Sequence, residues 1–228
     1  MSVRFKDRHD AGRRLALRLR RYAAEPNLVV LALPRGGVPV GGKVAAALGA
    51  PLDVFVVRKI GVPGREELAM GAVASDGVPV MHEAVVREFG ISREVFDRGV
   101  AREMAEIERR EQAYLAERTF PPIEGATVIL VDDGVATGST MEAAVRALRH
   151  LGPAAVIAAA PVMSREAHDR LDRLADGCEC LDLPEPFYGV GVYYLDFAQV
   201  SAGEVRAELR RCAQGCNGHE PQLAGGLP

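Results

Sequence analysis

The chain has 228 residues, of which 48% are hydrophobic, and this is enough apolar material for one domain with a sizeable core. Its net charge is −3 and its isoelectric point is about 6.0, which excludes the strongly basic surface of a general nucleic-acid or membrane-surface binder. No apolar run approaches the ~20 residues of a membrane span, and the basic N-terminal residues lack the apolar stretch of a signal peptide, so we expect a cytoplasmic protein with small-molecule ligands.

The first part of the chain alternates helix and strand patterns. Asp10 is a candidate N-cap for a helix that runs to about Tyr22. The elements predicted after it are a strand at 28–33, a helix at 38–48 that is closed by Gly49, and a strand at 52–57. Short β-branched runs without polar alternation are typical of strands that are buried on both faces of a parallel sheet.

The region from Gly61 to Pro122 breaks this rhythm. Residues 69–80 predict two short strands around a turn at Asp76-Gly77. Ser92 is a candidate cap for a long helix to about Arg118, whose polar face is highly charged and typical of a solvated surface.

The alternation resumes with apolar runs at 126–131 and 155–162, which predict two more buried strands. The helix between them begins near Thr140 and is stopped by Gly152-Pro153. Ser201-Ala-Gly-Glu204 is a capping box for a last helix. We therefore predict one α/β domain over 1–212 and a disordered tail over 213–228, where Gly, Pro, Gln and Asn dominate.

The four cysteines lie in the last quarter of the chain, at positions 178, 180, 212 and 216. Without a secretion signal, free thiols are favoured over a disulfide scaffold. Cys212, Cys216 and His219 could contribute to a metal site, but an obvious fourth ligand is missing.

The segment Val128-Ile-Leu-Val-Asp-Asp-Gly-Val-Ala-Thr-Gly-Ser-Thr140 carries the functional prediction. Its apolar run delivers Asp132 and Asp133 to the carboxyl end of a strand, where ligands of open α/β sheets bind. The small residues and hydroxyls that follow let backbone N–H groups and a helix N-terminus surround a phosphate. Carboxylates can accept hydrogen bonds from vicinal hydroxyls or hold a divalent metal. A sugar phosphate can bind both the two acids and the loop that follows them. The alternative interpretation of the segment is a strand followed by a solvated, well-capped helix without a ligand.

This segment resembles the signature of type I phosphoribosyltransferases, which bind 5-phosphoribosyl-1-pyrophosphate (PRPP): four apolar residues, two acids, two mostly apolar residues and a Thr-Gly loop. The resemblance implies that Asp132 and Asp133 meet the ribose hydroxyls. It also implies Mg²⁺ bound through PRPP, with these two acids as candidate ligands. The residues that it assigns to the 5′-phosphate are Ala136, Thr137, Gly138, Ser139 and Thr140.

The same resemblance implies a three-layer, Rossmann-like α/β fold, in which a mostly parallel sheet lies between helices. Its core would span about 25–165, with a flexible hairpin loop over about 61–80. A small hood would form from about 181–200 and the N-terminal segment. The whole chain also resembles bacterial phosphoribosyltransferases of unassigned substrate, some of them fused to hydrolase domains.

Two further loops fit the pyrophosphate end of PRPP. Leu33-Pro-Arg-Gly-Gly37 follows the first predicted strand, and the family resemblance assigns Arg35 and Gly36 to pyrophosphate. Arg58 and Lys59 follow the second apolar run and are candidates for the same role. The alternatives are a plain turn with an exposed Arg35, and a solvated basic pair.

The flexible loop of the family closes over the reaction centre and excludes water. Its charged candidates here are Arg65 and Glu67. The hood candidate holds five of the twelve aromatic residues, and Phe187, Tyr188, Tyr193 and Tyr194 are its predicted contacts to a base. The alternative is a hydrophobic cluster that seals the edge of the sheet.

Ala136 stands where purine-salvage members of the family carry an acid, which disfavours hypoxanthine or guanine as the acceptor. The Ala-Thr-Gly loop is more like that of uracil-type members, and the Asp-Asp pair is closer to orotate-type members. The acceptor base is therefore open.

We expect an enzyme of nucleotide metabolism that transfers the phosphoribosyl group from PRPP to a nitrogenous base and releases pyrophosphate. Its partners would be PRPP and a small base, without nucleic acid or membrane, and it would be a homodimer or a monomer. The first alternative is a non-catalytic module that senses PRPP or nucleotides. The second, a phosphoester hydrolase with the two Asp as metal ligands, has no histidine partner to support it.

Overall fold

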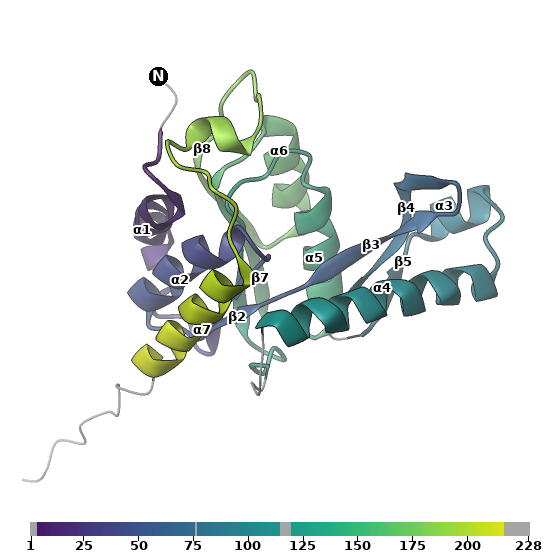
Figure 1. The fold of residues 1–228 in the computed structure, drawn as a ribbon, viewed down its shortest axis with the longest axis horizontal. Helices are drawn as coiled ribbons and strands as arrows, with labels where there is room; N and C mark the ends of the chain where they lie inside the picture. The colour runs from purple at the N-terminus through teal and green to yellow at the C-terminus, as the bar shows by residue number, and fades with distance from the viewer. Residues whose placement is uncertain (1–3, 76, 115–119, 217–228) are drawn as a thin grey trace, which may run out of the picture.

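A computed structural model describes residues 4–75, 77–114 and 120–216. These residues form a five-stranded sheet between two layers of helices, from which an arm with a second, three-stranded sheet projects (Figure 1). The five strands are all parallel, in the order β2-β1-β6-β7-β8. Their bounds are β1 Leu28–Ala32, β2 Leu52–Val54, β6 Thr127–Val131, β7 Ala155–Val162 and β8 Gly177–Asp182.

The apolar strands bury both faces of this sheet, because successive side chains point to opposite sides. Val30 and Ala32 face one layer, made of α1 Arg8–Leu19, α2 Gly37–Leu48 and α7 Ala202–Cys216. Val29 and Leu31 face the other, made of α5 Ser139–His150 and α6 Arg165–Leu174. The predicted three-layer α/β fold is confirmed.

Strands β1 and β6 are neighbours, and Ala32 lies opposite Val131 in the last pair of their register. The Leu33 backbone N–H donates to the Val131 carbonyl at 2.9 Å. The two chain segments that follow these strands therefore leave the sheet side by side at its carboxyl edge. This adjacency positions the candidate site.

The arm consists of an antiparallel sheet and two helices. Its sheet packs on α4 around a core of its own, which includes Ile60, Met70 and Phe96. The elements are β3 Val57–Val62, β4 Arg65–Ala74, β5 Pro79–Met81, α3 Glu83–Glu88 and α4 Arg93–Tyr114. The predicted turn at Asp76-Gly77 includes residue 76, which lies outside the described residues, and the Gly77 N–H donates to the Ala74 carbonyl at 2.9 Å. Ser92 caps α4 by accepting from the Val95 N–H at 3.3 Å.

The segment 61–80 was predicted as a flexible hairpin loop with two short strands, and its described residues belong mainly to β3, β4 and β5. Its glycines allow close packing. A Cβ on Gly71 would lie 2.8 Å from the Phe96 ring, and one on Gly61 would lie 2.7 Å from the Glu66 carbonyl oxygen. Glycine has a packing role here, which the sequence pattern does not distinguish from mobility.

Several predicted boundaries are wrong. The cap of α1 is Asp7, whose carboxylate accepts from the Asp10 N–H, and the helix ends at Leu19 before a 3-10 turn at Arg20–Tyr22. Helix α7 continues to Cys216, into the predicted tail, and residues 217–228 lie outside the described residues. Helix α6 and strand β8 were not predicted. No described helix is long and apolar enough to cross a membrane.

The predicted association of the hood with the N-terminal segment is present. The Phe5 N–H donates to the Tyr193 carbonyl, and the Leu195 N–H donates to the Phe5 carbonyl, both at 2.8 Å. Phe5 is fully buried against Tyr193, Tyr194 and Val162. The N-terminal segment and the hood therefore form one packed unit at the carboxyl edge of the sheet.

Candidate functional site

The two acids begin where β6 ends. The Asp132 N–H donates to the Ala159 carbonyl at 3.1 Å, and the Asp132 carboxylate accepts from the Asp133 N–H at 2.8 Å. Burial, and then the neighbouring charge of Asp133, raise the pKa of Asp132 well above its usual value. Burial also raises the pKa of Asp133, although Arg8 opposes this. The free site therefore holds two carboxyl groups whose ionised forms are disfavoured.

Asp133 makes contacts that sequence reasoning missed. Its Oδ2 accepts a hydrogen bond from Arg8 Nε at 2.7 Å, and its backbone carbonyl accepts one from the Tyr194 hydroxyl at 2.5 Å. The arginine belongs to the first turn of α1, 125 residues away in sequence. No local pattern around residue 8 could have indicated this pairing.

The predicted phosphate cradle lies between β6 and α5. Gly138 precedes the helix with φ +76°, a conformation that favours glycine. The hydroxyls of Thr137 and Ser139 lie 3.2 Å apart, and Thr140 is exposed. The first turn of α5 and three hydroxyl side chains therefore lie within one loop, which is the arrangement that suits a phosphate monoester.

Two residues that were not predicted support the cradle, one before α6 and one within it. The Ser164 hydroxyl donates to the Ala136 carbonyl at 2.6 Å and accepts from the Ala167 N–H at 3.1 Å. The Arg170 guanidinium donates to the Thr137 carbonyl. These bonds tie the Ala136 and Thr137 carbonyls to the segment that follows β7, so they fix the backbone of the loop.

The predicted pyrophosphate loop runs beside the acids. A Cβ on Gly37 would lie 2.6 Å from the Val131 carbonyl oxygen, so glycine lets the loop pass over the end of β6. The Pro34–Arg35 peptide bond is cis. Within the described ranges, no acid pairs with Arg35. Its half-buried guanidinium is therefore available to an anionic ligand at this edge.

Arg58 and Lys59 were predicted to follow a strand. They lie instead within β3. As neighbours in a strand they point to opposite faces. Arg58 Nε contacts the buried Glu103 of α4 at 2.9 Å, whereas Lys59 is exposed and lines a cavity with Ser139 of α5. Both side chains also line a second cavity that reaches Thr140 of the cradle, but Arg58 is engaged there by Glu103.

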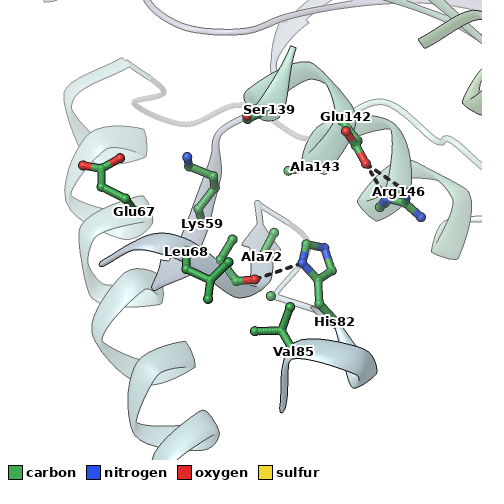
Figure 2. Close-up of a pocket in the computed structure, with 12 residues that line it drawn as sticks. Lys59, Glu67, Leu68, Ala72, His82, Val85, Ser139, Glu142, Ala143 and Arg146 are labelled. Carbon is green, nitrogen blue, oxygen red and sulfur yellow. Dashed lines mark hydrogen bonds and ion pairs between the residues drawn. The ribbon is translucent and has the colours of Figure 1, made fainter. Parts of the chain in front are cut away.

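A cavity of about 280 Å³ lies between the arm and α5. Figure 2 shows Lys59 and Glu67 on one side of it, and Ser139 and Glu142 of α5 on another. A second cavity, of about 370 Å³, brings Arg58, Lys59 and Glu67 together with Thr140. The arm therefore borders the phosphate cradle with side chains of both charges.

The two charged candidates of the expected flexible loop separate in the structure. Glu67 lines both cavities beside the cradle. The Arg65 guanidinium instead lies over the Phe89 ring, at 5.3 Å from its centroid, near the end of α3.

The predicted base contacts divide into two pairs. Tyr193 and Tyr194 are only 4% and 5% exposed and pack in the cluster that includes Phe5, so neither offers a free ring face to a base. Phe187 is half-buried against Tyr193 at a centroid distance of 5.5 Å, and Tyr188 is exposed. The alternative prediction, a hydrophobic cluster at the sheet edge, describes the first pair.

The cysteines whose side chains are described are free thiols. Burial raises the pKa of Cys178 to about 12 and that of Cys180 to about 11. Cys212 packs in the core, while His219 lies outside the described residues. Among the described residues, no three His, Cys, Asp or Glu side chains cluster as metal ligands.

Comparisons with known proteins agree with this geometry. A family model described as "Phosphoribosyl transferase domain" matches residues 4–197. Two Mycobacterium tuberculosis strains each have a protein named "Putative phosphoribosyl transferase" that is 43% identical over 207 residues. The match covers 91% of this chain but 46% of each relative, so the chain spans about half the length of these proteins.

A solved structure is also similar. The protein TT1426 from Thermus thermophilus is 40% identical, with a TM-score of 0.81, and the match covers 92% of this chain and 99% of that one. The family model spans most of the chain, and the signature acids and cradle lie within it. The chain therefore belongs to the type I phosphoribosyltransferase family.

Proposed function

We propose that the protein binds PRPP and transfers its 5-phosphoribosyl group to a ring nitrogen of a small base, with release of pyrophosphate. One observation carries the proposal. Asp132 and Asp133 lie at the end of β6, between the phosphate cradle on one side and the Arg35 loop on the other. The two acids match the ribose hydroxyls of PRPP, the cradle matches its 5′-phosphate, and the Arg35 loop matches its pyrophosphate.

In this reaction the bond from ribose C1 to the pyrophosphate oxygen breaks, and a bond from C1 to the base nitrogen forms. The nitrogen loses its proton, and pyrophosphate leaves with the bonding electrons. Arg35 and Lys59 would stabilise the charge that develops on pyrophosphate, because neither is engaged by an acid in the described part of the chain.

A magnesium ion fits this donor set. Mg²⁺ prefers carboxylate and phosphate oxygens and is usually bound through one or two carboxylates together with substrate phosphates. The Asp132 carboxylate is partly exposed at the strand end, so it would hold the ion, which would neutralise pyrophosphate charge.

The acceptor is proposed only as a class, a planar nitrogen heterocycle. Ala136 provides no acid for proton transfer on a purine ring, and its side chain is exposed beside the cradle. Phe187 and Tyr188 are the hood aromatics that keep accessible surface for stacking.

The test is to incubate the protein with labelled PRPP, Mg²⁺ and a panel of purine and pyrimidine bases, and to measure pyrophosphate release. We expect release with at least one base in the wild type and none in Asp132→Asn. Calorimetry with Mg²⁺–PRPP would be run alongside. Binding without release for any base would overturn transfer and support the alternative, a sensor of PRPP, whereas absence of binding would overturn both.

A further inference from the structure

Arg8 joins three parts of the molecule at the candidate site. Its Nε donates to Asp133 Oδ2 at 2.7 Å, and its Nη1 donates to the Ala198 carbonyl at 2.7 Å. Its guanidinium carbon lies 3.9 Å from the centroid of the Phe197 ring. One side chain from the first turn of α1 therefore contacts a signature acid and the hood together.

The ion pair is largely withdrawn from water. The Arg8 and Asp133 side chains are 11% and 13% exposed. On the side of the pyrophosphate loop, Gly36 lies so close that a Cβ would be 2.0 Å from Asp133 Oδ2. The Asp133 oxygen that meets Arg8 is therefore enclosed by protein groups on two sides.

Asp132 has different surroundings. The Asp132 carboxylate accepts a hydrogen bond from the adjacent Asp133 N–H, and Arg8 lowers the pKa of Asp132 only through its charge. The two acids of the signature are therefore unequal in this protein. Asp133 is engaged by a distant cation, while Asp132 keeps oxygen lone pairs for a ligand.

The backbone around Arg8 is tied to the hood as well. The Asp196 N–H donates to the Lys6 carbonyl at 2.9 Å, and the Tyr194 hydroxyl donates to the Asp133 carbonyl at 2.5 Å. The side chain and the backbone of Asp133 are thus both held by the unit of N-terminal segment and hood. A buried ion pair adds little net stability by itself, so its location at the signature acid points to a role in the site.

We propose that Arg8 is a positioning residue of the PRPP site. It fixes the Asp133 carboxylate, fastens the hood to it, and leaves Asp132 as the acid that meets the ribose hydroxyls. This inference rests on the proposed function, because the ribose contact exists only if the site binds PRPP.

The first experiment compares Arg8→Ala and Arg8→Lys with Arg13→Ala. Arg13 is on the same helix, its side chain is 58% exposed, and its guanidinium lies 3.7 Å from the Asp10 carboxylate. Arg13→Ala therefore removes a guanidinium that lies away from the candidate site. Affinities for Mg²⁺–PRPP and for Mg²⁺–pyrophosphate, which lacks ribose, are measured by calorimetry. For Arg8→Ala we expect PRPP binding to weaken roughly ten- to a hundredfold, as for loss of a charged hydrogen bond.

Pyrophosphate affinity should stay within about twofold of the wild type in Arg8→Ala. Arg8→Lys should recover part of the PRPP affinity, because lysine keeps the charge but cannot reproduce the hydrogen-bond geometry of the guanidinium. In an Arg8→Ala background, adding Asp133→Asn should weaken PRPP binding little further. Adding Asp132→Asn should still weaken it. Unchanged PRPP affinity in Arg8→Ala, or equal losses for PRPP and pyrophosphate, would overturn the proposal.

Hydrogen exchange of the hood amides at 190–198 gives a readout that does not depend on PRPP. Protection should fall in Arg8→Ala and stay unchanged in Arg13→Ala, while protection in β6 is retained in both. If the wild type does not bind PRPP, the proposed function fails by itself. The exchange result then decides whether Arg8 fastens the hood, and unchanged protection would overturn that role too.

Discussion

Gly36 and Asp133 are packed so closely that residue 36 has no room for a side chain: a Cβ there would lie 2.0 Å from Asp133 Oδ2. The reason is spatial, because Gly36 has φ −61°, which any residue can adopt. The carboxylate cannot turn away freely, since Arg8 holds the same oxygen at 2.7 Å. The pyrophosphate loop and the ribose acid are therefore one packed unit.

Gly36→Ala should consequently disturb both ends of the PRPP site. Either the loop shifts or Asp133 leaves Arg8. We expect PRPP affinity to fall at least about tenfold and the free energy of unfolding to fall by about 1–3 kcal/mol, as for overpacking. Calorimetry and urea unfolding measure the two effects.

Gly203→Ala is the matched control for this change. Gly203 lies in α7, where a Cβ would meet nothing closer than 3.7 Å, so alanine should leave PRPP binding unchanged and stabilise slightly. Equal PRPP affinity in Gly36→Ala and Gly203→Ala would contradict the packing argument.

Lys59 and Arg58 should separate binding from stability, because Arg58 is paired with the buried Glu103 whereas no acid pairs with Lys59 in the described residues. Lys59→Ala should weaken Mg²⁺–pyrophosphate binding about tenfold without a change in unfolding. Arg58→Ala should leave that affinity within about twofold. It should lower the free energy of unfolding by about 1 kcal/mol, since the buried Glu103 loses one of its two arginine partners. If Arg58→Ala weakened Mg²⁺–pyrophosphate binding and Lys59→Ala instead lowered the free energy of unfolding, the roles assigned to the two side chains would be wrong.

The sequence predicted four of the five strands of the main sheet and the signature loop, because these depend on local patterns. The apolar runs of β1, β6 and β7 are buried on both faces, and the segment from Asp132 to Thr140 has its chemistry in consecutive residues. The pairing of Arg8 with Asp133 joins residues far apart in the chain, and its geometry arises only when α1 and the hood meet.

The arm shows a second reason for errors. The apolar run 52–57 contains a break at Phe55-Val56, so Arg58 and Lys59 were assigned to a strand end when they lie inside β3. The segment that contains Gly71 was predicted to be flexible, and Phe96 packs where a side chain at residue 71 would be. Partner residues that decide such cases lie on α4, outside any local window.

Asp132 should destabilise the free protein at neutral pH. Burial and Asp133 raise the pKa of Asp132 in the folded state, whereas in the unfolded chain it is near the ordinary value of about 3.9. Above the raised pKa the carboxylate is ionised at a cost to the native state, so Asp132→Asn should increase the free energy of unfolding there. Below both pKa values the gain should vanish.

Urea unfolding at a series of pH values measures this change. Asp97→Asn is the control: its carboxylate is 52% exposed and pairs with Arg93 on the surface of α4, so its effect should stay within about 0.5 kcal/mol throughout. A pH-independent effect of Asp132→Asn would contradict the argument.

PRPP binding should depend on pH through the same carboxyl. Ribose hydroxyls and Mg²⁺ interact with the ionised form, and the raised pKa means that the proton is retained to a higher pH than in an ordinary aspartate. Affinity should therefore fall as the pH is lowered through the raised pKa, and binding below it should release a proton. Calorimetry in two buffers of different ionisation enthalpy measures that proton.

PRPP phosphates also titrate, near pH ~6, so the comparison with Asp132→Asn isolates the contribution of the protein. Asp132→Asn should bind PRPP more weakly than the wild type and release fewer protons on binding. Its PRPP affinity should also depend less on pH. If the wild type and Asp132→Asn release the same number of protons, the titrating group belongs to the ligand. Asp132 then meets neither the metal nor the ribose, and its raised pKa is a consequence of burial at the strand end alone.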